Sequence, residues 1–144
     1  MLIEIRPSLD PELAALVTAQ QRELAESGGS VGRLFEPHDD VEYLVGVVNG
    51  RGIAVAAWQQ SGPGGAEVRR IYVRPAFRGR GLARQMIVAV EEEALAAGRP
   101  WIRLELESRQ IAAIALYQSA GYRQVSVDGP SRVRFEKRLP ALVQ

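Results

Sequence analysis

The chain has 144 residues, of which 47% are hydrophobic and 24% charged, and its formal net charge is +1 at pH 7. These values fit one globular domain over residues 1–144 and give no sign of nucleic-acid or membrane partners. Without cysteine and with one histidine, disulfides, thiolate metal sites and a cysteine nucleophile are excluded and a histidine metal cluster is disfavoured.

The first forty residues predict a strand, a helix and a connecting loop. Residues 2–6 alternate apolar and polar side chains, as a half-buried strand does. Asp10 followed by Pro11 resembles a helix cap with proline at the first helical position, and helical apolar spacing continues to about Glu26. Glycine-rich residues 27–32 and an aperiodic stretch to Asp40 predict a loop that leaves His38 in solvent.

The middle of the chain predicts an antiparallel meander followed by a helix. Asn49-Gly50 is a strong hairpin pair between two strand patterns, and a second turn leads to a third strand. The amphipathic helix after Gly81 ends at Gly98, and its acidic run at 91–93 is expected to face water. The three strands are expected at 41–48, 52–59 and 67–74.

The last third predicts a strand at 101–107, a helix at 112–119 closed by Gly121, and two final strands at 122–127 and 132–137. A strand, a helix and a strand joined in this way imply a right-handed parallel crossover. The predicted fold class is therefore α/β, a mixed central sheet with antiparallel N-terminal strands, one parallel pair (67–74 with 101–107) and flanking helices. With no apolar run near ~18 residues and no leader pattern, we expect a cytoplasmic protein.

The segment 73–86, VRPAFRGRGLARQM, runs from a strand through a glycine-containing loop into a helix. Glycines let the backbone approach a ligand, and the first amides of a helix favour an anion. Three arginines add positive charge, so the segment predicts a pyrophosphate site. It lacks the GxxxxGK[ST] pattern, and Arg84 stands where a dinucleotide fingerprint needs its third glycine.

Two short motifs carry a family resemblance. Residues 78–83, R-x-x-G-x-A, resemble the [Q/R]-x-x-G-x-[G/A] motif of the GNAT superfamily of acyl-CoA N-acyltransferases. Residues 110–122, QIAAIALYQSAGY, resemble its second signature, N-x-x-A-x-x-L-Y-x-x-x-G-[F/Y]. The departure is Gln110, whose extra methylene shifts the amide from where asparagine would place it. Because both motifs occur in the right order and separation, the chain is identified as a member of this superfamily.

The resemblance implies acetyl-CoA as acyl donor, with no metal. The pantetheine arm would make strand-like bonds to residues 71–73, where a backbone N–H near Val73 could stabilise the oxyanion, and the amides of 78–84 would hold the pyrophosphate. The residues implied to bind the coenzyme are Ile71, Tyr72, Val73, Arg78, Gly79, Arg80, Gly81, Leu82, Ala83, Arg84, Gln110, Ala113 and Tyr117.

The resemblance also implies two catalytic residues. Tyr117 would donate a proton to the departing thiolate or hydrogen-bond the sulfur. Glu67, 14 residues before Gly81, would deprotonate the amine; alternatively it pairs with an arginine such as Arg69 and a water chain serves as base. The absence of cysteine favours direct attack in a ternary complex.

The acceptor is expected to be a primary amine of a small molecule or peptide. An acidic stretch could attract a cationic amine or be a solvated loop, and two arginines could instead bind a carboxylate. The alternative function is a non-catalytic acyl-CoA sensor or interaction domain, and a third interpretation is a nucleotide-binding protein. A homodimer formed through the last strands is an open possibility. The acidic stretch contains Glu36, His38, Asp39, Asp40 and Glu42, and the two arginines are Arg132 and Arg134. Trp58 is a further candidate for the acceptor pocket.

Overall fold

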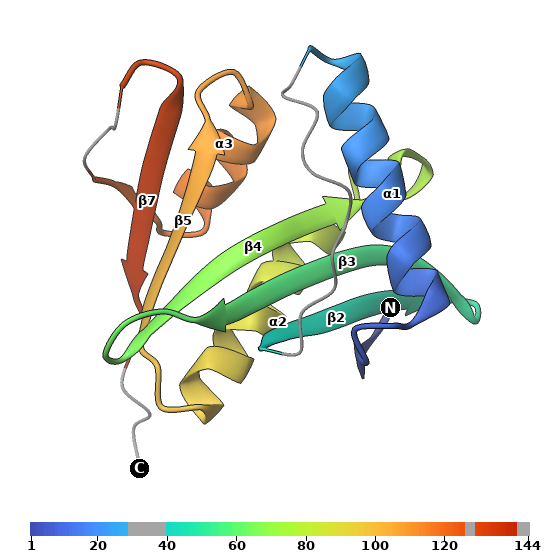
Figure 1. Cartoon of the computed structure of the whole chain (residues 1–144), viewed down its shortest axis with the longest axis horizontal. Coiled ribbons are helices and arrows are strands. Elements are labelled where there is room, and N and C mark those ends of the chain that lie inside the picture. Colours follow the sequence, from blue (N-terminus) through green and yellow to red (C-terminus); the bar gives the residue numbers. More distant parts are fainter. Residues whose placement is uncertain (29–39, 126–128, 141–144) are drawn as a thin grey trace. The chain divides into compact units, whose positions relative to one another are not determined.

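The computed structural model describes residues 1–28, 40–125 and 129–140. Within these residues it forms a seven-stranded mixed sheet in the order β1-β2-β3-β4-β5-β7-β6, flanked by three α-helices (Figure 1). The predicted fold class and the order of the major elements are thereby confirmed. The elements are β1 (Leu2–Arg6), α1 (Pro11–Glu26), β2 (Val41–Val48), β3 (Arg51–Gln60), β4 (Gly65–Val73), the 3-10 helix η1 (Pro75–Phe77), α2 (Leu82–Ala96), β5 (Trp101–Glu107), α3 (Ile111–Ser119), β6 (Arg123–Gln124) and β7 (Arg132–Arg138).

The chain divides into two compact units. The first contains Met1–Gln59 and Arg69–Val90, and the second contains Gln60–Val68 and Glu91–Gln144. Strand β4 and helix α2 each contribute residues to both units. Within the described part of the chain, no helix is both long and apolar enough to span a membrane.

In the first unit, β1, β2 and β3 are joined antiparallel, and helices cover both faces of this sheet segment (Figure 1). The hairpin between β2 and β3 turns at Asn49 and Gly50, whose φ angles of 51° and 76° suit a type I′ turn. On one face α1 buries its apolar side against strand residues. On the other face α2 packs against β2, where the Sδ of Met86 lies 3.2 Å from the position that a Cβ would take at Gly46. The cluster under α1 contains Leu13, Leu16, Val17, Tyr43, Val45, Val47, Val55, Ala57 and Tyr72.

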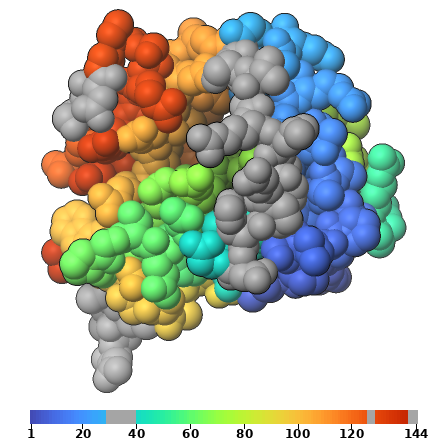
Figure 2. Space-filling model, in the orientation of Figure 1, coloured from blue at the N-terminus to red at the C-terminus, as the bar shows by residue number. Residues whose placement is uncertain are grey.

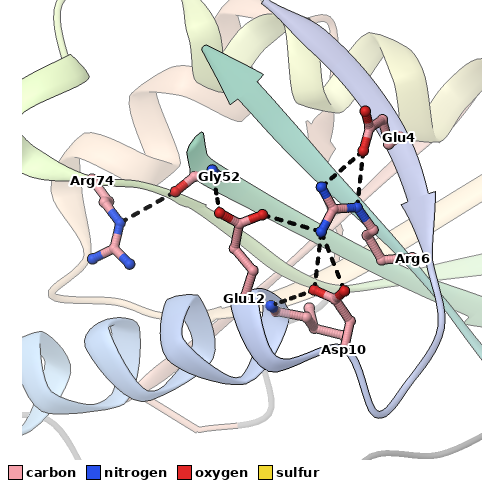
Figure 3. A network of polar contacts seen from close by, with 7 residues as sticks. Glu4, Arg6, Asp10, Glu12, Gly52 and Arg74 are labelled. Carbon is pink, nitrogen blue, oxygen red and sulfur yellow. Dashed lines mark hydrogen bonds and ion pairs between the residues drawn. The ribbon is translucent and has the colours of Figure 1, made fainter. Parts of the chain in front are cut away.

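A polar network fixes the start of α1 within this unit (Figure 3). Asp10 caps the helix by accepting a 2.9 Å hydrogen bond from the backbone N–H of Leu13, and it also pairs with Arg6. Arg6 lies between Glu4, Asp10 and Glu12, and the other oxygen of Glu12 accepts the Gly52 N–H at 2.7 Å. One network thus joins β1, α1 and the β2–β3 hairpin, while the outer side of α1 lies on the surface (Figure 2).

In the second unit, residues 65–67 of β4 pair in parallel with residues 101–103 of β5, and β5 pairs antiparallel with β7. One face of the β5–β7 pair is buried through Ile102, Leu104 and Phe135, whereas the side chains at 101, 103 and 105 on the opposite face are exposed. Strand β6 covers only Arg123–Gln124 instead of the predicted 122–127, and residues 126 and 127 of that range lie outside the described residues.

Candidate functional site

The loop between β4 and α2 has the strand–loop–helix geometry predicted for an anion site. Gly79 and Gly81 adopt φ angles of 81° and 74°, a left-handed conformation that side chains with a Cβ rarely adopt. No atom lies within 4 Å of where a Cβ would stand at either glycine, so the space beside the backbone is open. The N–H of Gln85 makes the first helical hydrogen bond, to the Gly81 carbonyl. The backbone amides before Gln85 are those of the first turn, which have no acceptor within the helix. A phosphate fits such a loop.

Arg78 uses its side chain for contacts inside the first unit. Its guanidinium lies 2.7 Å from a carboxylate oxygen of Glu23 in α1, and its Nε donates to the Val73 carbonyl at 2.9 Å. It also lies over the Tyr72 ring, 5.5 Å from the centroid. The hydrogen bond from Arg78 lowers the pKa of Glu23, so the carboxylate stays charged and offsets part of the loop's positive charge. Arg80 stands over the Phe77 ring at 5.5 Å.

The end of β4 holds the predicted pantetheine-binding residues. Tyr72 and Val73 are buried, and Tyr72 belongs to the core cluster under α1. The carbonyl of Ile71 accepts a 3.2 Å hydrogen bond from Gln20 of α1, while the N–H of Arg74 donates to the Ile53 carbonyl of β3. Helix α1 therefore contacts this strand through one hydrogen bond to its backbone as well as through the apolar core.

Gln110 stands immediately before α3, where the family motif commonly has asparagine. Its side-chain oxygen accepts a 2.9 Å hydrogen bond from the backbone N–H of Glu107 at the end of β5. It makes no side-chain cap bond to the helix. The longer side chain thus folds back onto its own turn, and Gln110 has a structural role in joining β5 to α3. Ala113, one turn further along, is half-buried.

Tyr117 is the most buried side chain of α3, with 4% of its surface exposed. Burial raises the pKa of its phenol, so the hydroxyl stays protonated across the neutral range. The helix ends in a Schellman motif: the N–H of Tyr122 bonds to the Tyr117 carbonyl at 3.0 Å, and Gly121, at φ 91°, bonds back to Gln118. The rings of Tyr117 and Tyr122 meet edge to face with centroids 5.3 Å apart.

The expected base, Glu67, is half-buried in β4 and stands opposite Arg103 in the parallel pairing with β5. It belongs to the second unit, as Tyr117 does. The guanidinium of Arg103 donates to the Ser61 carbonyl at 3.0 Å, which ties β5 to the turn before β4. The carboxylate therefore lies on the part of β4 that is paired with β5.

Several residues considered for acceptor binding already have protein partners. Glu42 accepts a 3.0 Å hydrogen bond from the indole N–H of Trp58, which lies opposite it across β2 and β3. Arg132 and Arg134 both pair with Glu105, at 3.1 and 2.7 Å, and their hydrogen bonds lower the pKa of that carboxylate. Asp40 is exposed, and Glu36, His38 and Asp39 lie outside the described residues.

Comparison with known proteins decides the family. The model of the acetyltransferase (GNAT) domain matches residues 39–124. An Azospirillum brasilense protein named IAA acetyltransferase is 32% identical over 133 residues, which cover 90% of this chain and 81% of that protein. The chain belongs to the GNAT family. Its members transfer acyl groups from acyl-CoA, and the superfamily predicted from the two motifs is confirmed.

Solved structures agree with the GNAT assignment. A Klebsiella pneumoniae protein assigned to the acyl-CoA N-acyltransferases superposes with a TM-score of 0.80 at 28% identity, covering 96% of this chain and 97% of the other. A Bacillus subtilis acetyltransferase in complex with CoA has the same fold, with a TM-score of 0.73 at 18% identity and coverage of 96% and 98%.

The predicted GNAT site residues fall into two groups. The first unit brings together the end of β4, the glycine loop and the start of α2, which are Ile71, Tyr72, Val73, Arg78, Gly79, Arg80, Gly81, Leu82, Ala83 and Arg84. The second unit contains Glu67, Gln110, Ala113 and Tyr117. Among these four, Ala113 and Tyr117 lie in α3 and Gln110 is its N-cap residue.

Two residues of this GNAT protein that sequence reasoning missed are Glu91 and Lys137. Glu91 was expected to face water, but only 13% of its side chain is exposed, which corrects that prediction. Its Oε2 accepts a hydrogen bond from the Tyr122 hydroxyl at 2.9 Å and one from Lys137 at 3.0 Å. Three consecutive glutamates indicate a solvent-exposed helix face, and nothing in the local sequence indicates that Glu91 pairs with a lysine 46 positions away.

Proposed function

We propose that this GNAT protein transfers the acetyl group of acetyl-CoA to a primary amine of a small molecule or peptide, by direct attack in a ternary complex. The proposal treats residues 1–144 as one catalytic domain. Tyr117 is the observation that carries it, because a buried tyrosine with a raised pKa occupies the signature position from which the family motif implies proton donation.

In this proposal the loop from Arg78 to Arg84 binds the coenzyme's pyrophosphate through backbone amides. The glycine conformations, the open space beside them and the helix start support this role. Arg78 contributes mainly by holding the loop against α1 and β4, because its guanidinium already contacts Glu23 and the Val73 carbonyl. The exposed guanidinium groups of Arg80 and Arg84 supply positive charge for the phosphates.

Tyr117 then acts at the sulfur. As the neutral amine attacks the thioester carbon, the C–N bond forms, the C–S bond breaks and the thiolate takes the phenol proton, so that free thiol leaves. The tyrosinate then takes the excess proton of the new amide nitrogen, which restores the phenol and leaves a neutral amide. Burial raises the pKa of the phenol, so Tyr117 carries its proton before the reaction begins and has a hydrogen to offer to the leaving sulfur. Glu67 removes a proton from the ammonium form of the acceptor before attack.

The test is release of free thiol from acetyl-CoA over a panel of amines that includes peptides and polyamines, with IAA, the compound in the relative's name, assayed beside them. We expect turnover with at least one compound and a fall in kcat of about 10²-fold or more in Tyr117→Phe. Tyr43→Phe, a buried tyrosine in the core under α1, is the matched control and should retain kcat.

Two outcomes would contradict the proposal. Coenzyme binding without turnover on any acceptor would favour the acyl-CoA sensor. Turnover with an unchanged kcat in Tyr117→Phe would keep the activity but remove the tyrosine from its proton-donating role.

A further inference from the structure

A partly buried polar cluster lies at the C-terminal end of α3, formed by Glu91 of α2, Tyr122 and Lys137 of β7. We call these three residues the Glu91 cluster. The Tyr122 hydroxyl donates to Glu91 at 2.9 Å, and the Lys137 ammonium lies 3.0 Å from the same carboxylate oxygen. Only 13% of the Glu91 side chain and 23% of the Lys137 side chain are exposed, so this is a largely desolvated ion pair.

Lys137 also binds the end of the helix. Its ammonium donates to the Ala120 carbonyl at 2.8 Å and lies 5.4 Å from the centroid of the Tyr122 ring. A cation at the C-terminus of a helix is favoured by the helix dipole, and a cation over an aromatic face is favoured by the ring quadrupole. One lysine therefore fixes both the last turn of α3 and the ring that follows it.

The cluster reaches Tyr117 through Tyr122 and also through Ala120, whose backbone N–H bonds to the Tyr117 carbonyl at 3.1 Å. Tyr122 holds Tyr117 by a backbone hydrogen bond of 3.0 Å and by the edge-to-face ring contact at 5.3 Å. The two rings are 4% and 3% exposed, which leaves little room for either to turn independently. Any shift of the Tyr122 ring therefore changes the packing surface that defines the position of the Tyr117 phenol.

Stability alone does not account for this arrangement. An ion pair that is removed from much of its water usually contributes little net stability, because the cost of desolvating both charges offsets their attraction. What the ion pair adds is directionality, since hydrogen bonds fix an orientation that apolar packing leaves less defined.

We propose that Glu91 and Lys137 are positioning residues for acyl transfer, which orient the Tyr117 phenol by holding Tyr122. This inference rests on the proposed role of Tyr117 as proton donor. Neither residue is expected to touch the coenzyme or the amine. Their effect should therefore appear in kcat and be absent from the KM for acetyl-CoA.

A double-mutant cycle tests the proposal, with the amine found in the panel. Tyr122→Phe removes one hydroxyl and keeps the ring, so it should lower kcat roughly three- to tenfold and leave the KM for acetyl-CoA within about twofold. In the Tyr117→Phe background the same change should alter kcat less than about twofold, because no hydroxyl remains to be oriented. Equal fold losses in both backgrounds, or an unchanged kcat in Tyr122→Phe, would overturn the inference.

A second measurement needs no substrate. In protein labelled with ¹³C-tyrosine, the ring resonances of Tyr117 should shift or broaden in Glu91→Gln and Lys137→Met, and Lys137→Arg should restore part of the wild-type spectrum. If either variant fails to fold, Tyr122→Phe supplies the same comparison with a smaller change. Unaltered Tyr117 resonances in the folded variants would refute the positioning role.

The two proposals fail in different ways. If Tyr117→Phe has normal kcat, the proton-donor role fails and the positioning role fails with it. If Tyr117→Phe is impaired while the Glu91 cluster variants have normal kcat and unaltered Tyr117 resonances, only the positioning role is wrong.

Discussion

Glu67 lies in the paired part of β4, in a position that suits its proposed role as the base. It is half-buried and lies opposite Arg103 across the parallel pair, within the same compact unit as Tyr117. An amine acceptor is protonated near neutral pH, so a group that accepts its proton raises the fraction able to attack. A carboxylate on a strand that is paired with its neighbour needs little rearrangement to accept the proton of the amine.

Glu67→Gln should therefore change the pH dependence of the reaction. With the base removed, kcat/KM at pH 7 should fall about tenfold or more and recover as pH rises toward the pKa of the free amine. Glu67→Asp keeps the carboxylate and should retain the shape of the wild-type profile at reduced rate. The measurement is kcat/KM from pH 6 to 10, and a Glu67→Gln profile that overlays the wild-type profile would assign deprotonation to another group.

Some residue roles could be predicted from the sequence and others could not, for a physical reason. The cap at Gly121 follows from local sequence, because a Schellman motif needs a left-handed residue just past the helix end, whose N–H bonds to the carbonyl three positions back while the next N–H bonds five positions back. The contacts of Glu91 with Lys137 and of Arg78 with Glu23 join residues 46 and 55 positions apart. Such pairs depend on how elements pack, which periodicity does not encode.

At the scale of elements, α1 combines a local cap with long-range ties. Asp10 both accepts the Leu13 N–H and pairs with Arg6, and its side chain is 16% exposed. The cap was predictable from Asp10-Pro11, since aspartate before proline is a common helix start. The hydrogen bond from Gly52 to Glu12 was not predictable from the sequence. Helix η1 was not predictable either, because three residues are too few to show a periodic pattern.

Two substitutions at Asp10 separate the cap from the charge. Asp10→Ala removes both and should cost about 1–2 kcal/mol of unfolding free energy. Asp10→Asn keeps a capping oxygen and removes only the ion pair with Arg6, so its loss should be less than half as large. Urea denaturation of both variants measures the difference. Equal losses would mean that the ion pair, and not the cap, holds the start of α1.

At the scale of the whole molecule, the order of elements followed from hydrophobic period and turn residues, and the parallel pair of β4 and β5 followed from the strand–helix–strand connection. Alternation predicts that a segment is a strand but not which strand lies beside it, so the placement of β7 between β5 and β6 came from the structure. The short extent of β6 was also not predictable, because pairing with β7 and not residue type decides where it ends.

Coenzyme binding should stabilise the whole chain against heat, and α2 offers a matched pair of glycines for testing where it binds. A ligand at about 100 times its Kd adds roughly 2.7 kcal/mol, which for a chain of this size raises Tm on the order of 5–10 °C. Gly81 precedes α2 and Gly98 follows it, and both have a φ of 74° with no atom within 4 Å of the Cβ position. Alanine should therefore strain both sites equally and lower the Tm of the free protein by similar amounts.

Only Gly81→Ala should also lose most of the Tm increase with coenzyme A, because it alone changes the loop proposed to hold the pyrophosphate. Gly98→Ala should keep the full increase, and NAD at the same concentration should give little increase with either variant or the wild type. The measurement is a thermal melt of the three proteins with and without each ligand. An equal coenzyme A response in both variants would move the pyrophosphate site away from the glycine loop, and an equal response to NAD would favour a general nucleotide-binding protein.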